Sequence, residues 1–257
     1  MKLTLIVLFS AAIVLQTAVF AEKPRNFRLN VEYGYNEVNT SLNERWKIRQ
    51  DVGTSYYDSN NRRVFSHLFM NQFAVKPEWQ LFDGKLAFET GLKYSHLNSA
   101  LDMELQSNGL PAYFFLHYNS TGIETEYAKV HSITENSHYL SVPMEIKLTP
   151  LRWKNFDLFV KTGIDLGIRL NTSTKIDFVN KAMLEYQQTV FERVGVTNNK
   201  YLACWNNSVG ISYGRENGLR YRLEVLLPSM LLSKNNSSLV DGEMFTGLRL
   251  ALQIPGK

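Results

Sequence analysis

The sequence predicts an all-β protein: an eight-stranded antiparallel up-and-down transmembrane β-barrel with short periplasmic turns and long extracellular loops. Three observations support this fold class. Eight segments alternate apolar and polar residues with period two, which is typical of strands whose two faces meet different environments. The connections between them are alternately long and short along the chain. The polar faces combine charged with small residues, whereas the opposite faces are almost entirely apolar.

The stretch from 79 to 96 shows the alternation most clearly. Asp83-Gly84 separates two alternating segments, and this dipeptide favours a tight hairpin because glycine accepts the positive φ that the turn needs. After the turn, one face is uncharged and the other carries ions and small residues. The uncharged face consists of Leu86, Phe88, Thr90, Leu92 and Tyr94, and the other of Lys85, Ala87, Glu89, Gly91, Lys93 and Ser95.

The remaining strands follow the same rule. Proline cannot donate to the ladder, so Pro77 predicts a bulge in the second strand. The long connections are expected to be polar loops, and the one from 171 to 200 is expected to contain a helical or extended piece around 182–193. The eight predicted strands comprise residues 27–35, 68–81, 85–95, 139–148, 156–170, 201–213, 219–227 and 243–254.

The apolar faces are expected to point outward, toward lipid. A soluble barrel would instead bury its apolar face and expose its charges. Here the polar faces carry small residues such as Gly34, Gly163 and Gly247 beside their ions, a combination that fits the narrow interior of a closed eight-strand sheet. Aromatic residues near the strand ends, such as Trp79 and Tyr213, are typical of the girdles at the two membrane interfaces. The alternative is a soluble exported barrel of the lipocalin type.

Composition restricts the other classes of protein. Residues 1–21, with Lys2, an apolar run and Ala21 before a polar segment, predict a secretory signal peptide followed by a barrel domain at 22–257. The single cysteine, Cys204, excludes an intramolecular disulfide, and alternation directs it into the barrel. The net charge of +4 is small and dispersed, which argues against a nucleic-acid partner.

Two segments carry a resemblance to a known family. The hairpin segment from Gly84 to Ser95 resembles a "GKL-x-x-x-TGL-x-Y-S" pattern, and the segment from Tyr139 to Lys147 is similar to a "YL-x-[IV]-P-x-x-x-K" strand. Both patterns belong to the PorT-like outer-membrane β-barrels of Bacteroidota. The resemblance spans residues 27–254, and it implies architecture and an outer-membrane location. It implies no enzymatic activity.

The charged residues of the polar faces are interpreted as interlocked ion pairs that fill the lumen. A proton or ion path is the alternative, but buried charges are tolerable when opposite signs are matched, as they nearly are here. The predicted structural network consists of Arg28, Glu32, Glu89, Lys93, Glu145, Lys161, Asp165, Arg169, Arg222, Glu224 and Arg249.

An apolar aromatic segment interrupts the polar connection after the third strand. It could form a recognition surface, because exposed aromatic patches mark binding sites. It could equally be a strand extension that packs against Trp46, Tyr56 and Tyr57 of the first long connection. The candidate binding patch consists of Tyr113, Phe114, Phe115 and Tyr118.

The five histidines all fall near strand tops or in the predicted outer loops. With Ser132, Ser137 and Asp102 they could form a hydrolase or acyltransferase site, but no motif supports this, and loop polarity explains them. We therefore expect no catalytic, cofactor-binding or metal-binding residue. The histidines are His67, His96, His117, His131 and His138.

The sequence predicts a small, monomeric outer-membrane barrel that acts as a non-enzymatic structural anchor or a surface binding platform. Its expected partners are outer-membrane lipid and an unidentified surface ligand or protein. Two alternatives stay open: an outer-membrane enzyme that modifies lipid, and a soluble lipocalin-like barrel that binds a hydrophobic molecule. No cofactor is expected for any of them.

Overall fold

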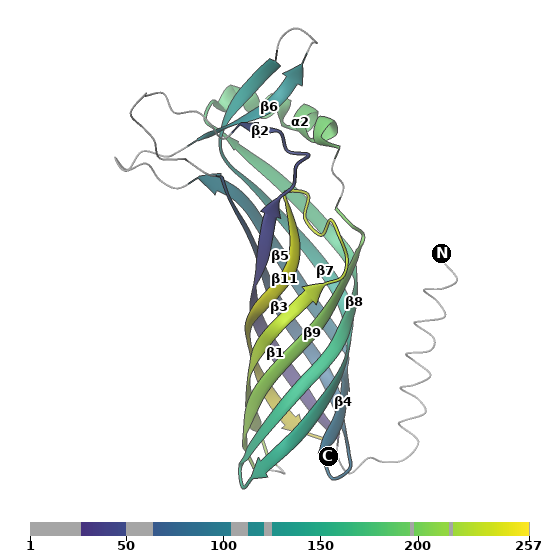
Figure 1. The fold of residues 1–257 in the computed structure, drawn as a ribbon. Helices are drawn as coiled ribbons and strands as arrows, with labels where there is room; N and C mark the ends of the chain where they lie inside the picture. The colour runs from purple at the N-terminus through teal and green to yellow at the C-terminus, as the bar shows by residue number, and fades with distance from the viewer. Residues whose placement is uncertain are drawn as a thin grey trace, which may run out of the picture.

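The computed structural model describes residues 27–49, 64–103, 113–120, 125–195, 198–215 and 218–256. In this part of the chain the strands form one long cylinder, with a small cap of helix and hairpin at one end (Figure 1). The predicted signal peptide at 1–21 lies outside the described residues, as do Tyr56 and Tyr57. No described helix has the length and apolar character needed to cross a membrane.

Eight strand positions close the cylinder. Each strand pairs antiparallel with its neighbours, and the last pairs with the first, for example Tyr33 with Leu250. This ring confirms the predicted eight-stranded antiparallel barrel. The strands of the ring are β1 (Phe27–Leu42), β3 (Val64–Leu81), β4 (Leu86–Thr90) continued by β5 (Leu92–Met103), β7 (Thr125–Trp153), β8 (Phe156–Phe178), β9 (Tyr201–Gly214), β10 (Arg220–Leu231) and β11 (Val240–Pro255).

The cap is built from four further elements. Strand β6 (Phe114–Ser120) forms a hairpin with the start of β7, and β2 (Ile48–Arg49) adds to its other edge. The 3-10 helix η1 (Lys181–Tyr186) and helix α2 (Gln187–Val194) follow β8. These helices confirm the expected helical piece around 182–193.

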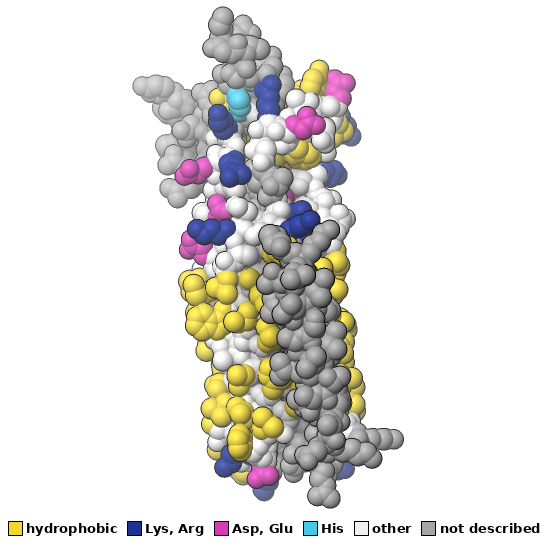
Figure 2. Space-filling view, turned by 90° about the vertical axis from the view of Figure 1, so that its right-hand side faces the viewer, with side chains coloured by type: hydrophobic (Ala, Val, Ile, Leu, Met, Phe, Trp, Pro, Cys, Tyr) yellow, Lys and Arg dark blue, Asp and Glu magenta, His cyan; other side chains and the backbone are white. Residues whose placement is uncertain are grey.

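The apolar faces point outward in the lower part of the barrel, as predicted. Leu92, Ile146 and Leu248 are 57%, 51% and 55% exposed, whereas Lys76 and Glu89 are fully buried. Figure 2 shows the apolar side chains gathered over the lower part of the cylinder, with charges above and below them. The apolar residues therefore form a band around the outside, and the ions line the inside.

The strands extend well beyond their predicted upper ends, and the reason is an inversion of the pattern. Above Leu170 the outward residues of β8 become polar, namely Ser173, Lys175 and Asp177, while Ile176 and Phe178 are buried inside. Such a wall has water outside and a conventional apolar core within. The expected loops at 98–137 and 171–200 are therefore wrong in part, because a strand without an apolar outer face has the polar composition of a solvated loop.

The predicted bulge at Pro77 was also wrong. Strand β3 keeps one continuous register with β1 through Leu29↔Pro77. The irregularity lies in the opposite partner, where Gly91 separates β4 from β5 with φ +153°. A Cβ at Gly91 would lie 2.2 Å from the carbonyl oxygen of Val75, so the strands approach closely there.

Replacing Gly91 with valine is expected to destabilise the barrel by roughly 1–3 kcal/mol, since the left-handed φ and the close backbone contact both oppose a side chain. Urea unfolding in detergent measures this. The matched control is Gly218→Ala, where the nearest atom to a new Cβ is the Cβ of Arg215 at 3.4 Å. Equal urea midpoints for the two variants would contradict the explanation that the backbone conformation and the close contact at Gly91 exclude a side chain.

Candidate functional site

The centre of the lumen is a buried network of ion pairs. Four carboxylates surround the ammonium group of Lys161, at 3.5 Å from Glu32, 3.5 Å from Glu89, 3.2 Å from Glu145 and 2.9 Å from Glu224. All five side chains are buried. Because strand alternation aims every second side chain at the axis, residues from five different strands meet here.

A second layer of cations lies against the same carboxylates. Arg222 pairs with Glu89 at 2.9 Å and with Glu224 at 2.8 Å, and it also reaches Glu78 at 3.2 Å. Lys147 pairs with Glu78 at 2.6 Å. Each carboxylate of this network therefore has at least one cationic partner, which offsets the large cost of desolvating it.

Further pairs extend the network along the axis. Lys93 lies 2.6 Å from Asp165, and Arg249 lies 3.3 Å from Glu145. Toward the lower end, Arg220 lies 2.6 Å from Asp157. The ring of Phe159, which is 2% exposed, packs under the guanidinium of Arg222 at 4.7 Å from its centroid.

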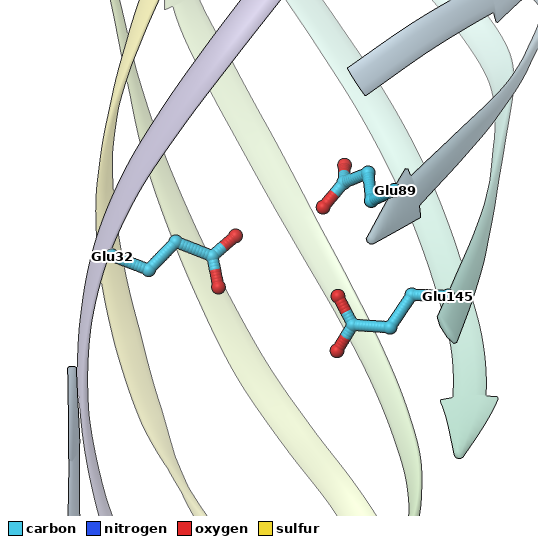
Figure 3. Close-up of side chains that lie close together, drawn as sticks. All are labelled: Glu32, Glu89 and Glu145. Atoms are coloured by element: carbon cyan, nitrogen blue, oxygen red, sulfur yellow. The ribbon is translucent and has the colours of Figure 1, made fainter. Parts of the chain in front are cut away.

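Three glutamates converge in a way that suggests a metal site by composition alone. Glu32, Glu89 and Glu145 point toward one another from three parts of the wall, each with a carboxylate oxygen within 4.8 Å of the others (Figure 3). Lys76 and Lys161 fill the space between them, since Lys76 pairs with all three carboxylates. The charge that a metal would supply is therefore already provided by two ammonium groups.

The lumen leaves little free space. The gap bordered by Glu32, Gln72, Lys93 and Arg249 is too small to hold a water molecule. Several side-chain amides fill the space between the ions, such as Asn206, which donates to Asp165 at 2.7 Å. The described lumen is therefore a packed polar core.

Most of the predicted network residues lie together in the lumen, and two lie elsewhere. Arg28 lies toward the lower end, where it donates to Gln253 at 2.7 Å. Arg169 lies above the network, only partly buried, and donates to the backbone oxygen of Asn198. Alternation also directs five further ions inward, and all of them are buried in ion pairs: Lys76, Glu78, Lys147, Asp157 and Arg220. Lys76 lies two residues before the inward-facing Glu78, so the period-two alternation of a strand directs it into the lumen as well.

The candidate binding patch is divided between the two faces of the β6–β7 hairpin. Phe114 is buried in the apolar core with Trp46, so this residue packs and is not available as surface. Tyr113 and Phe115 lie on the opposite face, with ring centroids 5.6 Å apart and the ammonium of Lys129 over Tyr113 at 4.8 Å. The side chain of Tyr118 lies outside the described residues.

The same outer face carries more rings. His117 contacts Tyr127 edge to face at 5.7 Å. We call Tyr113, Phe115, His117, Tyr127 and Lys129 together the aromatic face. It lies in the cap, above the apolar band, on strands that are fixed from behind by the buried core.

His67, His96 and His138 lie on the outside of the upper wall. His96 and His138 stack at 4.7 Å on the outside of the wall, and they bond to Asn136 and Tyr94. His67 lies 3.5 Å from Asp102, with both side chains exposed. In the described residues, no hydrogen bond joins these three histidines to a serine or cysteine side chain.

His138, which lies above the apolar band, has a pKa below its usual value of 6.5, because partial burial and the neighbouring His96 both disfavour the charged ring. A pKa lowered by folding means that this group contributes stability above pH 6.5, which is lost as the pH falls. His96→Gln should raise the pKa of His138, as measured by NMR titration of its ring protons. An unchanged value would contradict the coupling.

Comparisons with known proteins identify no family for this chain. No family model matches the chain, and a search of curated proteins gives no match. Among solved structures it is similar to outer membrane protein OprG from Pseudomonas aeruginosa (11% identity, TM-score 0.38, 90% of this chain and 98% of that one). It is also similar to the outer membrane protease OmpT (12%, 0.38, 90% and 97%) and outer membrane protein W (9%, 0.33, 90% and 99%), both from Escherichia coli.

Proposed function

We propose that this protein is an integral outer-membrane β-barrel, a non-enzymatic anchor that holds the aromatic face above the membrane surface as a binding platform. The observation that carries the proposal is the division of the wall into two levels. The lower level has an apolar outside and an ionic inside, as lipid requires, and the upper level, most clearly along β8, has a largely polar outside and an apolar inside. The change between them marks the membrane surface.

The packed lumen favours a role as an anchor rather than as a channel. Lys161, Arg222 and Lys76 tie carboxylates from opposite walls together at the barrel centre. Moving a solute along the axis would require separating these buried pairs, which is energetically costly. The purified barrel in planar bilayers is therefore expected to give no steady conductance, and reproducible single-channel steps would contradict the closed lumen.

The aromatic face has the composition of a recognition surface. Exposed aromatic rings contribute large contact areas with little loss of conformational freedom. The face is built on paired strands, so its geometry is fixed before a ligand arrives. The protein is proposed to act as a monomer.

The family and location are part of this proposal. Similarity of the segments at 84–95 and 139–147 to the PorT-like motifs supports a place among the outer-membrane barrels of Bacteroidota. Residues 1–21 are proposed to act as the signal peptide that exports the chain.

Cysteine labelling on intact cells tests the location and orientation together. Cys204 is 1% exposed, so the native thiol should not react with the maleimide. Lys129→Cys, on the aromatic face, should react with a membrane-impermeant maleimide, whereas Lys154→Cys, in the turn between β7 and β8, should react only after the outer membrane is opened. Labelling of both in intact cells, or recovery of the protein in a soluble fraction, would contradict the proposal.

A further inference from the structure

The barrel wall is open along part of one strand. The ladder between β8 and β9 runs from Phe156↔Tyr213 up to Ile168↔Tyr201. One more backbone bond follows, from Arg169 N–H to the oxygen of Lys200 at 2.8 Å. Strand β8 continues to Phe178, and among the described residues no strand pairs with it on this side above Ile168.

The backbone groups of two threonines point to this open side. The amide of Ile176 donates to the Oε1 atom of Gln187 at 3.1 Å, away from β7. Residues 171–177 keep one register with β7, and backbone groups alternate sides along an antiparallel ladder. Thr172 and Thr174 therefore present their N–H and C=O groups on the same side as Ile176.

A cavity of about 520 Å³ lies next to these two threonines. Helix α2 covers it with Gln188, Phe191 and Val194, and Trp46 and Glu135 lie on its inner side. Its volume falls within the usual range for sites that bind small ligands. The exposed Leu170 lies at its lower end, where the apolar band stops, so the cavity opens just above the proposed membrane surface.

We propose that this cavity binds an extended peptide segment by strand addition to the free edge of β8. Such a segment continues the existing β8–β9 ladder at the point where β9 ends, and its backbone pairs with Thr172 and Thr174. Strand addition recognises backbone amides in alternation, which is the chemistry that this edge offers and that a lipid chain lacks. The site is separate from the aromatic face and does not depend on it.

The lining also specifies the side chain that enters. Glu135 already accepts hydrogen bonds from the amide and hydroxyl of Ser238 and from the hydroxyl of Thr174. Its charge is thus satisfied without a cationic ligand. Trp46, Phe191 and Val194 form the apolar part of an otherwise polar wall, so a peptide side chain that packs against this part is apolar.

A random hexapeptide phage library, panned over the full-length protein in lipid nanodiscs, tests the proposal. Wild type should enrich sequences with an apolar residue flanked by strand-forming residues. Thr172→Pro removes the N–H that the edge offers while leaving the ladder with β7, and it should weaken binding of an enriched synthetic peptide at least tenfold. Thr172→Ala keeps the N–H and should bind as wild type does.

Two further measurements keep the test decisive. Val194→Trp fills the cavity from α2 and should abolish binding even if Thr172→Pro fails to fold. The amides of Thr172 and Thr174 should exchange quickly in the free protein and become protected when the peptide is bound. No enrichment, equal binding to Thr172→Pro or Val194→Trp, or saturable binding of a spin-labelled fatty acid in place of peptide would overturn the proposal.

Discussion

A Lys161→Met variant is expected to lose about 3–5 kcal/mol of the free energy of unfolding, because it removes one partner from buried ion pairs and leaves the charge of the other uncompensated. Lys161 lies within 3.5 Å of four buried carboxylates. Without Lys161, four cations, Lys76, Lys147, Arg222 and Arg249, would remain for five carboxylates, the four above and Glu78. Urea unfolding of the refolded barrel in detergent, followed by the mobility of unboiled protein on gels, measures the loss.

Two control variants separate charge from packing. Lys161→Met combined with Glu224→Gln restores the charge balance of the lumen and should recover part of the lost stability. Lys154→Met removes a lysine at the exposed turn after β7, and such surface changes usually stay within roughly 0.5 kcal/mol. If Lys161→Met is no less stable than Lys154→Met, the network does not stabilise the barrel.

An Ile164→Arg variant, which places arginine on the outer surface, should lose nearly as much stability as Lys161→Met. Ile164 is 42% exposed near the middle of the apolar band, where it pairs with Met144 of β7. An arginine on the lipid face costs about 2–4 kcal/mol at the bilayer midplane and little near the interfaces. Ile164→Arg should therefore lower the yield of folded protein in vesicles and its resistance to urea there.

The matched control moves the same residue along the same strand. Ser173 also faces outward on β8 but lies above the apolar band, among polar neighbours. Ser173→Arg should have the stability of wild type in the same vesicles. Equal losses at both positions would mean that the band at Ile164 does not contact hydrocarbon.

The membrane-spanning half of the fold could be predicted from sequence because one rule governs it. Where the outside is lipid and the inside is ionic, every strand alternates between residue classes that differ strongly. Glu89 and Lys93 are inward and Leu92 is outward for that reason, as predicted. The same alternation identifies most of the ion-pair network, since side chains on the axis of a narrow barrel have few other partners.

The upper half could not be predicted because its contrast is weaker and reversed. Residues such as Ser132 and Glu135 suggest a loop, although they belong to a 29-residue strand, β7. The inward positions there, Ile133 and Val130, form an apolar core with segments far away in the chain. The open edge of β8 also has no local signal, because it depends on where a different strand, β9, begins.

For the candidate binding patch, too, the sequence alone does not show which residues are buried and which are exposed. Alternation on a two-stranded hairpin divides Phe114 from Tyr113 and Phe115, so half of an aromatic cluster becomes core and half becomes surface. A sequence that is aromatic at consecutive positions cannot show which half is exposed until the pairing partner is known. Pairing of Phe114 with Val130 supplies that information.

Lipid contact of the outer wall is the most direct test of the account. Methyl-labelled protein in nanodiscs, with a nitroxide attached to the lipid acyl chain, should show strong broadening of Leu92, Ile146, Ile164 and Leu248. Buried Leu97 and Ile133, inside the upper wall, should keep sharp signals. A protein that stays soluble without detergent, or broadening that spares the four outer residues, would contradict a barrel that turns its apolar face to lipid.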